Sequence, residues 1–229
     1  MKQISFLIKP ASSLCNMKCR YCFYGDVSRN RKEKSMGIMK QDVMQALIQK
    51  SLNMDMEEVH YCFQGGEPCM AGIHYFRDFI STVHEYNNGK KITYSIQTNG
   101  TLLDHEWVKL FAENDFLVGV SLDGFIRNHD YFRRDGSDKG TFKRILYNIR
   151  QLRNAGVFYN ILTVLTHELS RKPEELFHFY CENGFDYVQL IPCLPSLKKN
   201  EPTDRYSLQP RDFSSFYKKF FDLWYEEFR

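Results

Sequence analysis

The sequence of 229 residues predicts an α/β protein in which helices cover a parallel β-sheet. First, six short apolar segments alternate with longer segments of helical periodicity. Second, the apolar segments are nearly continuous, as expected of strands that are buried on both faces. Third, unusual polar or glycine- and proline-containing sequences follow five of the six apolar segments. Periodicity by itself allows two architectures, an open doubly wound sheet and a barrel or partial barrel.

The elements can be assigned from local signals along the chain. Asp104 is a favourable N-cap, Gly156 suits the position after a helix end, and Pro173 fits a first helical turn. The strands are expected at 4–8, 58–63, 91–96, 116–122, 160–166 and 187–191. The helices are expected at 38–52, 74–86, 104–114, 141–156, 172–184 and 211–228.

The composition is that of an ordinary globular protein, with 43% apolar and 26% charged residues. The net charge of +3 is too small to indicate a nucleic-acid partner. No apolar run approaches the roughly 18 residues of a membrane-spanning helix. The start, MKQISFLIKP, is too short and interrupted to be a secretory signal. We therefore expect a cytoplasmic protein with no membrane partner, whose seven cysteines are reduced.

The last predicted helix, 211–228, is strongly amphipathic. Its apolar face predicts a helix that packs on the preceding sheet. The alternative is that this face also packs against a segment further along a longer chain. Its aromatic positions are Phe213, Phe216, Tyr217, Phe220, Phe221, Trp224 and Phe228.

Three cysteines, Cys15, Cys19 and Cys22, lie in the sequence LCNMKCRYCFYG at residues 14–25. Their C-x₃-C-x₂-C spacing lacks the fourth nearby Cys or His of a structural zinc site, since His60 is the next such residue. Three thiolates can hold three irons of a [4Fe–4S] cluster and leave the fourth iron open. An open coordination position marks a metal centre that binds a reactant.

Further unusual sequences follow the other predicted strands. QGGEP follows the second strand, QTNGT the third, SLDG the fourth and IPCLP the sixth. In both candidate architectures the C-terminal ends of parallel strands meet at one rim, where ligands bind. We therefore expect these sequences to converge with the three cysteines on a single site.

The pattern C-x₃-C-x-Y-C, in which Tyr21 precedes Cys22, resembles the signature of the radical S-adenosylmethionine (SAM) enzymes. The resemblance implies a partial (β/α)₆ TIM-like barrel with parallel strands, the radical SAM core. It also implies two cofactors: a [4Fe–4S] cluster held by Cys15, Cys19 and Cys22, and S-adenosyl-L-methionine chelated at the open iron. An electron from the cluster then cleaves S-adenosylmethionine to methionine and a 5′-deoxyadenosyl radical.

The sequence GGEP at 65–68 resembles the second-strand motif of this family. It implies that the backbone carbonyls of Gly65 and Gly66 accept hydrogen bonds from the cofactor ammonium. Glu67 would add negative charge nearby, and Tyr21 would contact the adenine.

Three more residues match cofactor-binding positions of the resembled family. Ser121 would donate a hydrogen bond to the cofactor carboxylate, and the guanidinium fork of Arg133 suits the same group. Leu194 would line the adenine pocket. Without the family, a solvated loop charge is the preferred interpretation of Arg133, and an ordinary buried leucine is the alternative for Leu194.

The resemblance extends to the anaerobic sulfatase-maturating enzymes through FLIKPASSLCNMKCRYCFY, FQGGEP, SIQTNGTLLD, FLVGVSLDG and FDLWYEEF. Those enzymes oxidise a cysteine or serine of a sulfatase to Cα-formylglycine without oxygen. The resemblance therefore implies a sulfatase polypeptide as substrate and an electron donor such as flavodoxin or ferredoxin. Tyr24 and Gln64 match positions that face the substrate peptide.

The resembled enzymes also carry a C-terminal SPASM domain with two auxiliary [4Fe–4S] clusters, and their proposed general base lies beyond the barrel. We therefore expect residues 1–229 to form one radical SAM core domain without a SPASM domain, and we assign no catalytic base. Cys62 and Cys181 are expected to be buried packing residues. The alternatives are a maturase that makes thioether crosslinks in peptides and an inactive domain that binds cofactor or a partner protein.

Overall fold

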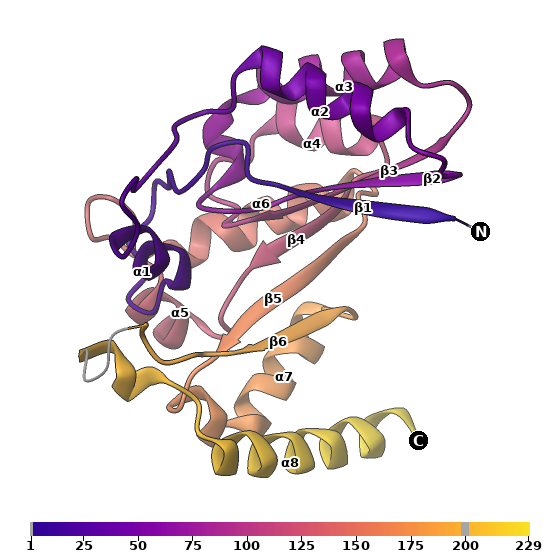
Figure 1. The fold of residues 1–229 in the computed structure, drawn as a ribbon. Coiled ribbons are helices and arrows are strands. Elements are labelled where there is room, and N and C mark those ends of the chain that lie inside the picture. Colours follow the sequence, from indigo (N-terminus) through magenta and orange to yellow (C-terminus); the bar gives the residue numbers. More distant parts are fainter. Residues whose placement is uncertain (1, 198–201) are drawn as a thin grey trace.

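The computed structural model describes residues 2–197 and 202–229, which contain a six-stranded parallel sheet (Figure 1). The strands lie in the sheet in chain order, from the first to the sixth. A doubly wound sheet reverses its order at a switch point, so this alternative is excluded and the curled sheet is the predicted partial barrel. The strands are β1 (Gln3–Ile8), β2 (Glu58–Phe63), β3 (Lys91–Thr98), β4 (Leu117–Ser121), β5 (Tyr159–Leu165) and β6 (Val188–Pro192).

Helices follow the strands, and most of them cover the convex face of the sheet (Figure 1). They are α1 (Phe23–Arg29), α2 (Gln41–Leu52), α3 (Ile73–Tyr86), α4 (His105–Glu113), α5 (Ile126–Phe132), α6 (Phe142–Asn154), α7 (Pro173–Asn183) and α8 (Pro210–Phe228). Short 3₁₀ helices are η1 (Pro68–Ala71), η2 (Leu169–Arg171) and η3 (Pro202–Tyr206). Figure 1 shows α1 and α5 at the C-terminal ends of the strands, on the side away from the N-terminus.

The two faces of the sheet differ in burial, as strand β2 illustrates. Val59, Tyr61 and Phe63 are fully buried toward the helices. Between them, His60 and Cys62 are half-buried on the concave face. Alternate side chains of a strand point to opposite faces, so one face builds the core and the other is left partly open.

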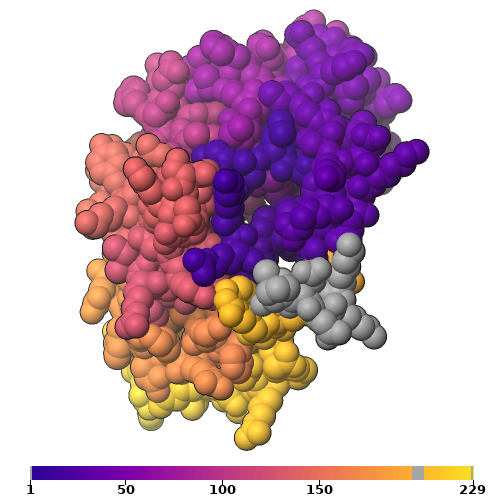
Figure 2. All heavy atoms as spheres, turned by 90° about the vertical axis from the view of Figure 1, so that its left-hand side faces the viewer, coloured from indigo at the N-terminus to yellow at the C-terminus, as the bar shows by residue number. Residues whose placement is uncertain are grey.

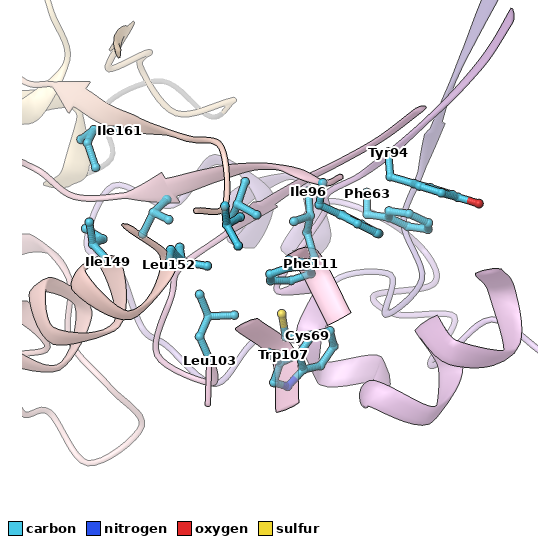
Figure 3. Close-up of a cluster of buried hydrophobic side chains, with 14 of the residues drawn as sticks. Phe63, Cys69, Tyr94, Ile96, Leu103, Trp107, Phe111, Ile149, Leu152 and Ile161 are labelled. Carbon is cyan, nitrogen blue, oxygen red and sulfur yellow. The ribbon is translucent and has the colours of Figure 1, made fainter. Parts of the chain in front are cut away.

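Aromatic rings dominate the core between the sheet and the helices. Figure 3 shows Phe63 and Ile96 from the strands on the same side as Trp107 and Phe111 of α4. The ring centroid of Phe63 lies 4.9 Å from that of Phe76, in an edge-on arrangement. Burying one such side chain contributes about 1.5–3 kcal/mol, which makes this core the main support of the strand ends.

All twelve predicted strands and helices are present, with ends that differ by at most three residues. Asp104 accepts a hydrogen bond from the Trp107 amide at 3.1 Å and so caps α4 as predicted. Gly156 follows α6 with a φ of 70°, and Pro173 opens α7. The seven-residue helices α1 and α5 were not predicted, because so short a segment carries little periodic signal.

Helix α8 packs on α7 through one of its aromatic stripes. Phe216 is buried, and the ring of Phe220 lies 5.5 Å from that of Phe177. A second stripe is exposed and holds Phe221 and Trp224, whose rings lie 6.0 Å apart. The Phe228 side chain lies outside the described residues.

Two further predictions concern exposure. Cys181 is exposed on α7, so the prediction that it is a buried packing residue was wrong; the apolar side chains beside it, not the thiol, face the sheet. Cys62 is half-buried on the concave face. In the described part of the chain, no helix is long and apolar enough to cross a membrane.

Candidate active site

The cysteine loop after β1 brings Cys15, Cys19 and Cys22 to the C-terminal end of the barrel. Cys22 is the N-cap of α1, and its Sγ accepts a hydrogen bond from the Gly25 amide at 3.3 Å. The Sγ of Cys15 accepts from the Met17 amide at 3.4 Å. Burial raises the pKa of Cys19 to about 12, although the nearby Arg133 guanidinium opposes this. Because thiolates are the metal ligands, such thiols lose their protons when a metal binds.

The three thiols line one cavity of about 430 Å³, within the usual size range of small-ligand sites. Figure 2 looks onto this end of the molecule, where the indigo N-terminal segment lies in the middle. The inner faces of β3, β5 and β6 provide Gln97, Leu162, Val164 and Ile191 as walls. The predicted residues that line the same cavity are Cys15, Cys19, Tyr21, Cys22, Tyr24, Gln64, Gly65, Gly66, Ser121, Arg133 and Leu194.

The two glycines after β2 let the cysteine loop approach closely. A Cβ on Gly66 would lie 2.2 Å from the Leu14 carbonyl oxygen, and Gly65 has a φ of 128° that disfavours any side chain. The Gly66 amide donates to the Ser12 carbonyl at 3.0 Å, which fixes the two loops together. Among the described residues, nothing donates a hydrogen bond to the carbonyls of Gly65 and Gly66. They are therefore free acceptors at the cavity.

Glu67 is fully buried behind this loop and does not line the cavity. Its carboxylate accepts hydrogen bonds from the Thr98 hydroxyl at 2.7 Å, the Asn99 amide at 2.6 Å and the Cys69 amide at 3.0 Å. Burial raises the pKa of Glu67, and these three hydrogen bonds oppose the rise. The carboxylate thus ties the end of β2 to the end of β3. That Glu67 contacts a cofactor stays a prediction.

Asp123 follows β4, is also fully buried and, like Glu67, does not line the cavity. It accepts from Arg133 Nε at 3.0 Å and Nη2 at 3.2 Å, in a bidentate ion pair. It also accepts from the Tyr21 hydroxyl and, at 3.0 Å, from the Val164 amide. The Nε–Nη2 edge of the Arg133 guanidinium is therefore occupied, and a bound carboxylate could use only the remaining N–H groups, on Nη1 and Nη2.

His129 supports the Asp123 loop from behind. Its Nδ1 accepts from the Asp123 amide at 3.2 Å, so its Nε2 carries the proton and donates to the Thr141 hydroxyl at 3.0 Å. The Thr141 hydroxyl donates in turn to the Arg133 carbonyl at 3.2 Å. Burial lowers the pKa of His129 to about 4, so the ring is neutral at physiological pH.

The two residues predicted to face a substrate touch each other. The Tyr24 hydroxyl donates to Gln64 Oε1 at 3.1 Å, and the Lys9 ammonium lies 4.7 Å above the Tyr24 ring. Leu194 is 63% exposed at the edge of the cavity and is not an ordinary buried leucine. Ser121 lies half-buried at the end of β4.

The sequence matches the family model of the Radical SAM superfamily over residues 10–180. This range covers most of the chain and contains the three cysteines, the glycine pair and Asp123. The chain belongs to the radical SAM superfamily. Its cofactors are therefore those of the family, a [4Fe–4S] cluster and S-adenosylmethionine, as predicted.

Comparison with individual relatives shows which enzymes of the superfamily this chain resembles. A cysteine-type anaerobic sulfatase-maturating enzyme of Clostridium novyi is 44% identical over the whole chain, which covers 61% of that protein. A serine-type enzyme of Bacteroides thetaiotaomicron is 28% identical over 99% of the chain and 58% of its own length. A solved structure described as native anSMEcpe with bound AdoMet and Kp18Cys peptide has a TM-score of 0.92 and 39% identity, over 99% of this chain and 61% of that one. The predicted resemblance is confirmed, and the chain spans about three fifths of these relatives.

The residues of this radical SAM chain fit the two cofactors. Among the described residues, no three Cys, His, Asp or Glu side chains converge on one metal ion. A four-iron cluster does not need such convergence, because each thiolate binds a different iron. The free carbonyls of Gly65 and Gly66 can accept from the ammonium of S-adenosylmethionine, and the cavity takes in both groups of residues.

Sequence reasoning missed two residues that organise the site, although both lie in motifs it singled out. Asp123 is the third residue of SLDG, and Asn99 is the third residue of QTNGT. Asn99 Nδ2 lies 3.8 Å from Cys15 Sγ and donates to Asn16 Oδ1 at 2.9 Å. Asn99 therefore links the end of β3 to the cysteine loop.

Proposed function

We propose that residues 1–229 are a radical SAM core domain that activates S-adenosylmethionine to oxidise a cysteine of a sulfatase polypeptide to Cα-formylglycine. The observation that carries the proposal is that three thiols, two free glycine carbonyls and the Tyr24–Gln64 pair line one cavity. The higher identity to a cysteine-type than to a serine-type enzyme supports cysteine as the target. When bound, the cluster and S-adenosylmethionine supply the oxidising power to remove a hydrogen atom from a substrate C–H bond.

The residues of the cavity then bind the cluster, orient the cofactor and the substrate, and exclude water. The thiolates of Cys15, Cys19 and Cys22 hold the cluster. Gly65 and Gly66 fix the ammonium of the cofactor through their carbonyls, and position the cofactor where the substrate enters.

The opposite wall binds the rest of the cofactor. The Ser121 hydroxyl donates to the cofactor carboxylate, and the N–H groups of Arg133 that Asp123 does not occupy can donate to the same group. Tyr21 and Leu194 border the adenine, while Leu162 and Val164 keep water from the reacting atoms.

The Tyr24–Gln64 pair supports a peptide substrate. Because the Tyr24 hydroxyl donates to Gln64, the Gln64 amide nitrogen is left as a donor and the Tyr24 hydroxyl oxygen as an acceptor, beside the cysteine loop where a peptide backbone can hydrogen-bond. Burial raises the pKa of Tyr24, which keeps its hydroxyl protonated as a donor. The reaction also needs a one-electron donor, for which we propose a separate carrier protein.

The test is anaerobic reconstitution with iron and sulfide, followed by reduction in the presence of S-adenosylmethionine and a sulfatase peptide that contains its target cysteine. We expect methionine and 5′-deoxyadenosine, and a peptide mass that reports formylglycine. Replacing Cys15, Cys19 and Cys22 with Ala should abolish the cluster absorbance, whereas Cys181→Ala, outside the cavity, should keep it. A loaded cluster that yields no 5′-deoxyadenosine contradicts the proposal, and a crosslinked peptide would assign a different maturase reaction.

A further inference from the structure

Positive charge is concentrated in one segment of the chain, residues 18–40, here called the basic segment. It holds seven Lys or Arg residues and two acidic residues, a net charge of +5. The whole chain carries +3, so the remaining residues together carry −2. The charge is therefore distributed unevenly along the chain, although the net charge is small. An uneven charge distribution of this kind can steer charged partners to one part of the surface. The basic residues are Lys18, Arg20, Arg29, Arg31, Lys32, Lys34 and Lys40.

The basic segment is fixed against the cysteine loop. The Lys34 carbonyl accepts hydrogen bonds from the Ser13 hydroxyl at 2.5 Å and the Ser28 hydroxyl at 2.6 Å. The Met36 amide donates to the Ser12 hydroxyl at 3.0 Å. Ser12 and Ser13 lie three and two residues before Cys15, and Cys19 and Cys22 lie within the segment itself. These hydrogen bonds hold the charges beside the predicted iron ligands.

The basic groups at residues 31–34 of the segment are exposed to solvent. Arg31, Lys32 and Lys34 are exposed, and no ion pair joins them to an acidic side chain among the described residues. The acidic residues of the segment are Asp26, which lies 3.6 Å from Arg29, and Glu33. Beyond the segment, Asp135 lies opposite Met17, the residue before Lys18, and Asp138 is paired with Arg134 at 3.0 Å. Positive charge therefore prevails around the loop.

Apolar side chains are exposed between these charges. Phe23 is 49% exposed, Met36 80% and Ile38 47%. Phe23 is the residue after Cys22, so an apolar contact is available directly beside the cluster ligands. A surface of scattered apolar residues among like charges suits a short-lived protein contact better than a permanent one.

We propose that the basic segment is the docking surface for an acidic one-electron carrier protein that reduces the cluster. The proposal rests on the proposed function, because only a redox cluster needs such a donor. Electron-transfer encounters bury little surface, below about 1,200 Å², and depend on complementary charge for their rate. The chemistry balances simply: the carrier loses one electron, the cluster gains it, and no bond or proton has to move.

The experiment compares two charge-reversed variants of the reconstituted chain at low ionic strength. One carries Arg31→Glu, Lys32→Glu and Lys34→Glu. The matched control carries Lys50→Glu, Lys109→Glu and Lys218→Glu, three exposed positions on α2, α4 and α8 away from the loop. Both variants change the net charge equally. Stopped-flow absorbance follows cluster reduction by reduced flavodoxin, an acidic flavin protein, and by photoreduced 5-deazariboflavin, a small uncharged reductant.

We expect the basic-segment variant to be reduced by flavodoxin at least about tenfold more slowly than the unmodified chain, with an effect that shrinks as salt is added. The control should stay within about twofold, and deazariboflavin should reduce all three proteins equally. Equal slowing of both variants, or no slowing, overturns the proposal. So does an unchanged reduction rate with a raised KM for the sulfatase peptide, which would assign the surface to the substrate.

Cleavage of S-adenosylmethionine is scored in the same samples. If the unmodified chain is reduced but forms no 5′-deoxyadenosine, the proposed function fails. The reduction rates still decide whether flavodoxin docks on the basic segment, because they are measured on the cluster and not on the product.

Discussion

Two buried carboxylates lie behind the residues that line the cavity, Glu67 after β2 and Asp123 after β4, and they are stabilised in different ways. Each carboxylate and its partners are called here the Glu67 wall and the Asp123 wall. Glu67 receives hydrogen bonds from uncharged groups alone, a hydroxyl and two backbone amides. Asp123 receives a bidentate guanidinium from Arg133 as well as a phenol and an amide. A buried charge can thus be stabilised by oriented dipoles or by an opposite charge. The difference teaches that the Glu67 wall depends on hydrogen-bond geometry and the Asp123 wall on charge balance.

The Asp123 wall should be the more sensitive to loss of charge. Asp123→Asn keeps the size of the side chain but leaves the buried Arg133 without its counter-charge. We expect a loss of about 3–5 kcal/mol in the free energy of unfolding, measured by urea denaturation. The double variant Asp123→Asn/Arg133→Met should recover much of this loss, because no unpaired charge remains. If the double variant is as unstable as the single one, charge balance is not what holds this wall.

The same wall should respond to acid through His129. The pKa of the ring is lowered to about 4 in the folded chain, against an ordinary value near 6.5. The unfolded chain therefore binds the extra proton first, and stability falls as the pH drops from about 6.5 to about 4. The full shift corresponds to on the order of 3 kcal/mol. The difference in unfolding free energy between the wild type and His129→Asn should shrink over this window. A constant difference would contradict a buried neutral ring.

The Glu67 wall should tolerate loss of charge better. Glu67→Gln keeps one acceptor oxygen for Thr98 and Cys69 but turns an amide toward the Asn99 amide, which leaves two donors unsatisfied. We expect a loss of about 1–3 kcal/mol, smaller than that of Asp123→Asn, in the same urea measurement. Thr98→Val, which removes the hydroxyl that donates to Glu67 and accepts from the Gly100 amide, is the control for the loss of neutral hydrogen bonds alone. A loss that equals the Asp123→Asn effect would erase the distinction between the two walls.

The sheet and its outer helices could be predicted because their signals are local. Apolar runs, the Asp104 cap and the Pro173 start each act within a few residues, and each is found as expected. The resemblance to a known family then chose the partial barrel, which periodicity could not do.

The two walls could be predicted only as motifs, because their partners come from distant parts of the chain. Tyr21 and Asp123 lie 102 positions apart, and Asn99 and Cys15 lie 84 positions apart. No local pattern states such a pairing. For the same reason the fork of Arg133 looked free in the sequence, although it is held by a carboxylate ten positions earlier.

The cap of helix α1 links metal binding to local order. Seven residues are too few to form a stable helix alone, so α1 depends on its N-cap and its contacts. That cap is Cys22, which is also a predicted iron ligand. Loading the cluster and ordering residues 23–29 are then coupled equilibria, and each favours the other by the same free energy. Since the basic segment contains α1, the proposed docking surface is best ordered when there is a cluster to receive the electron.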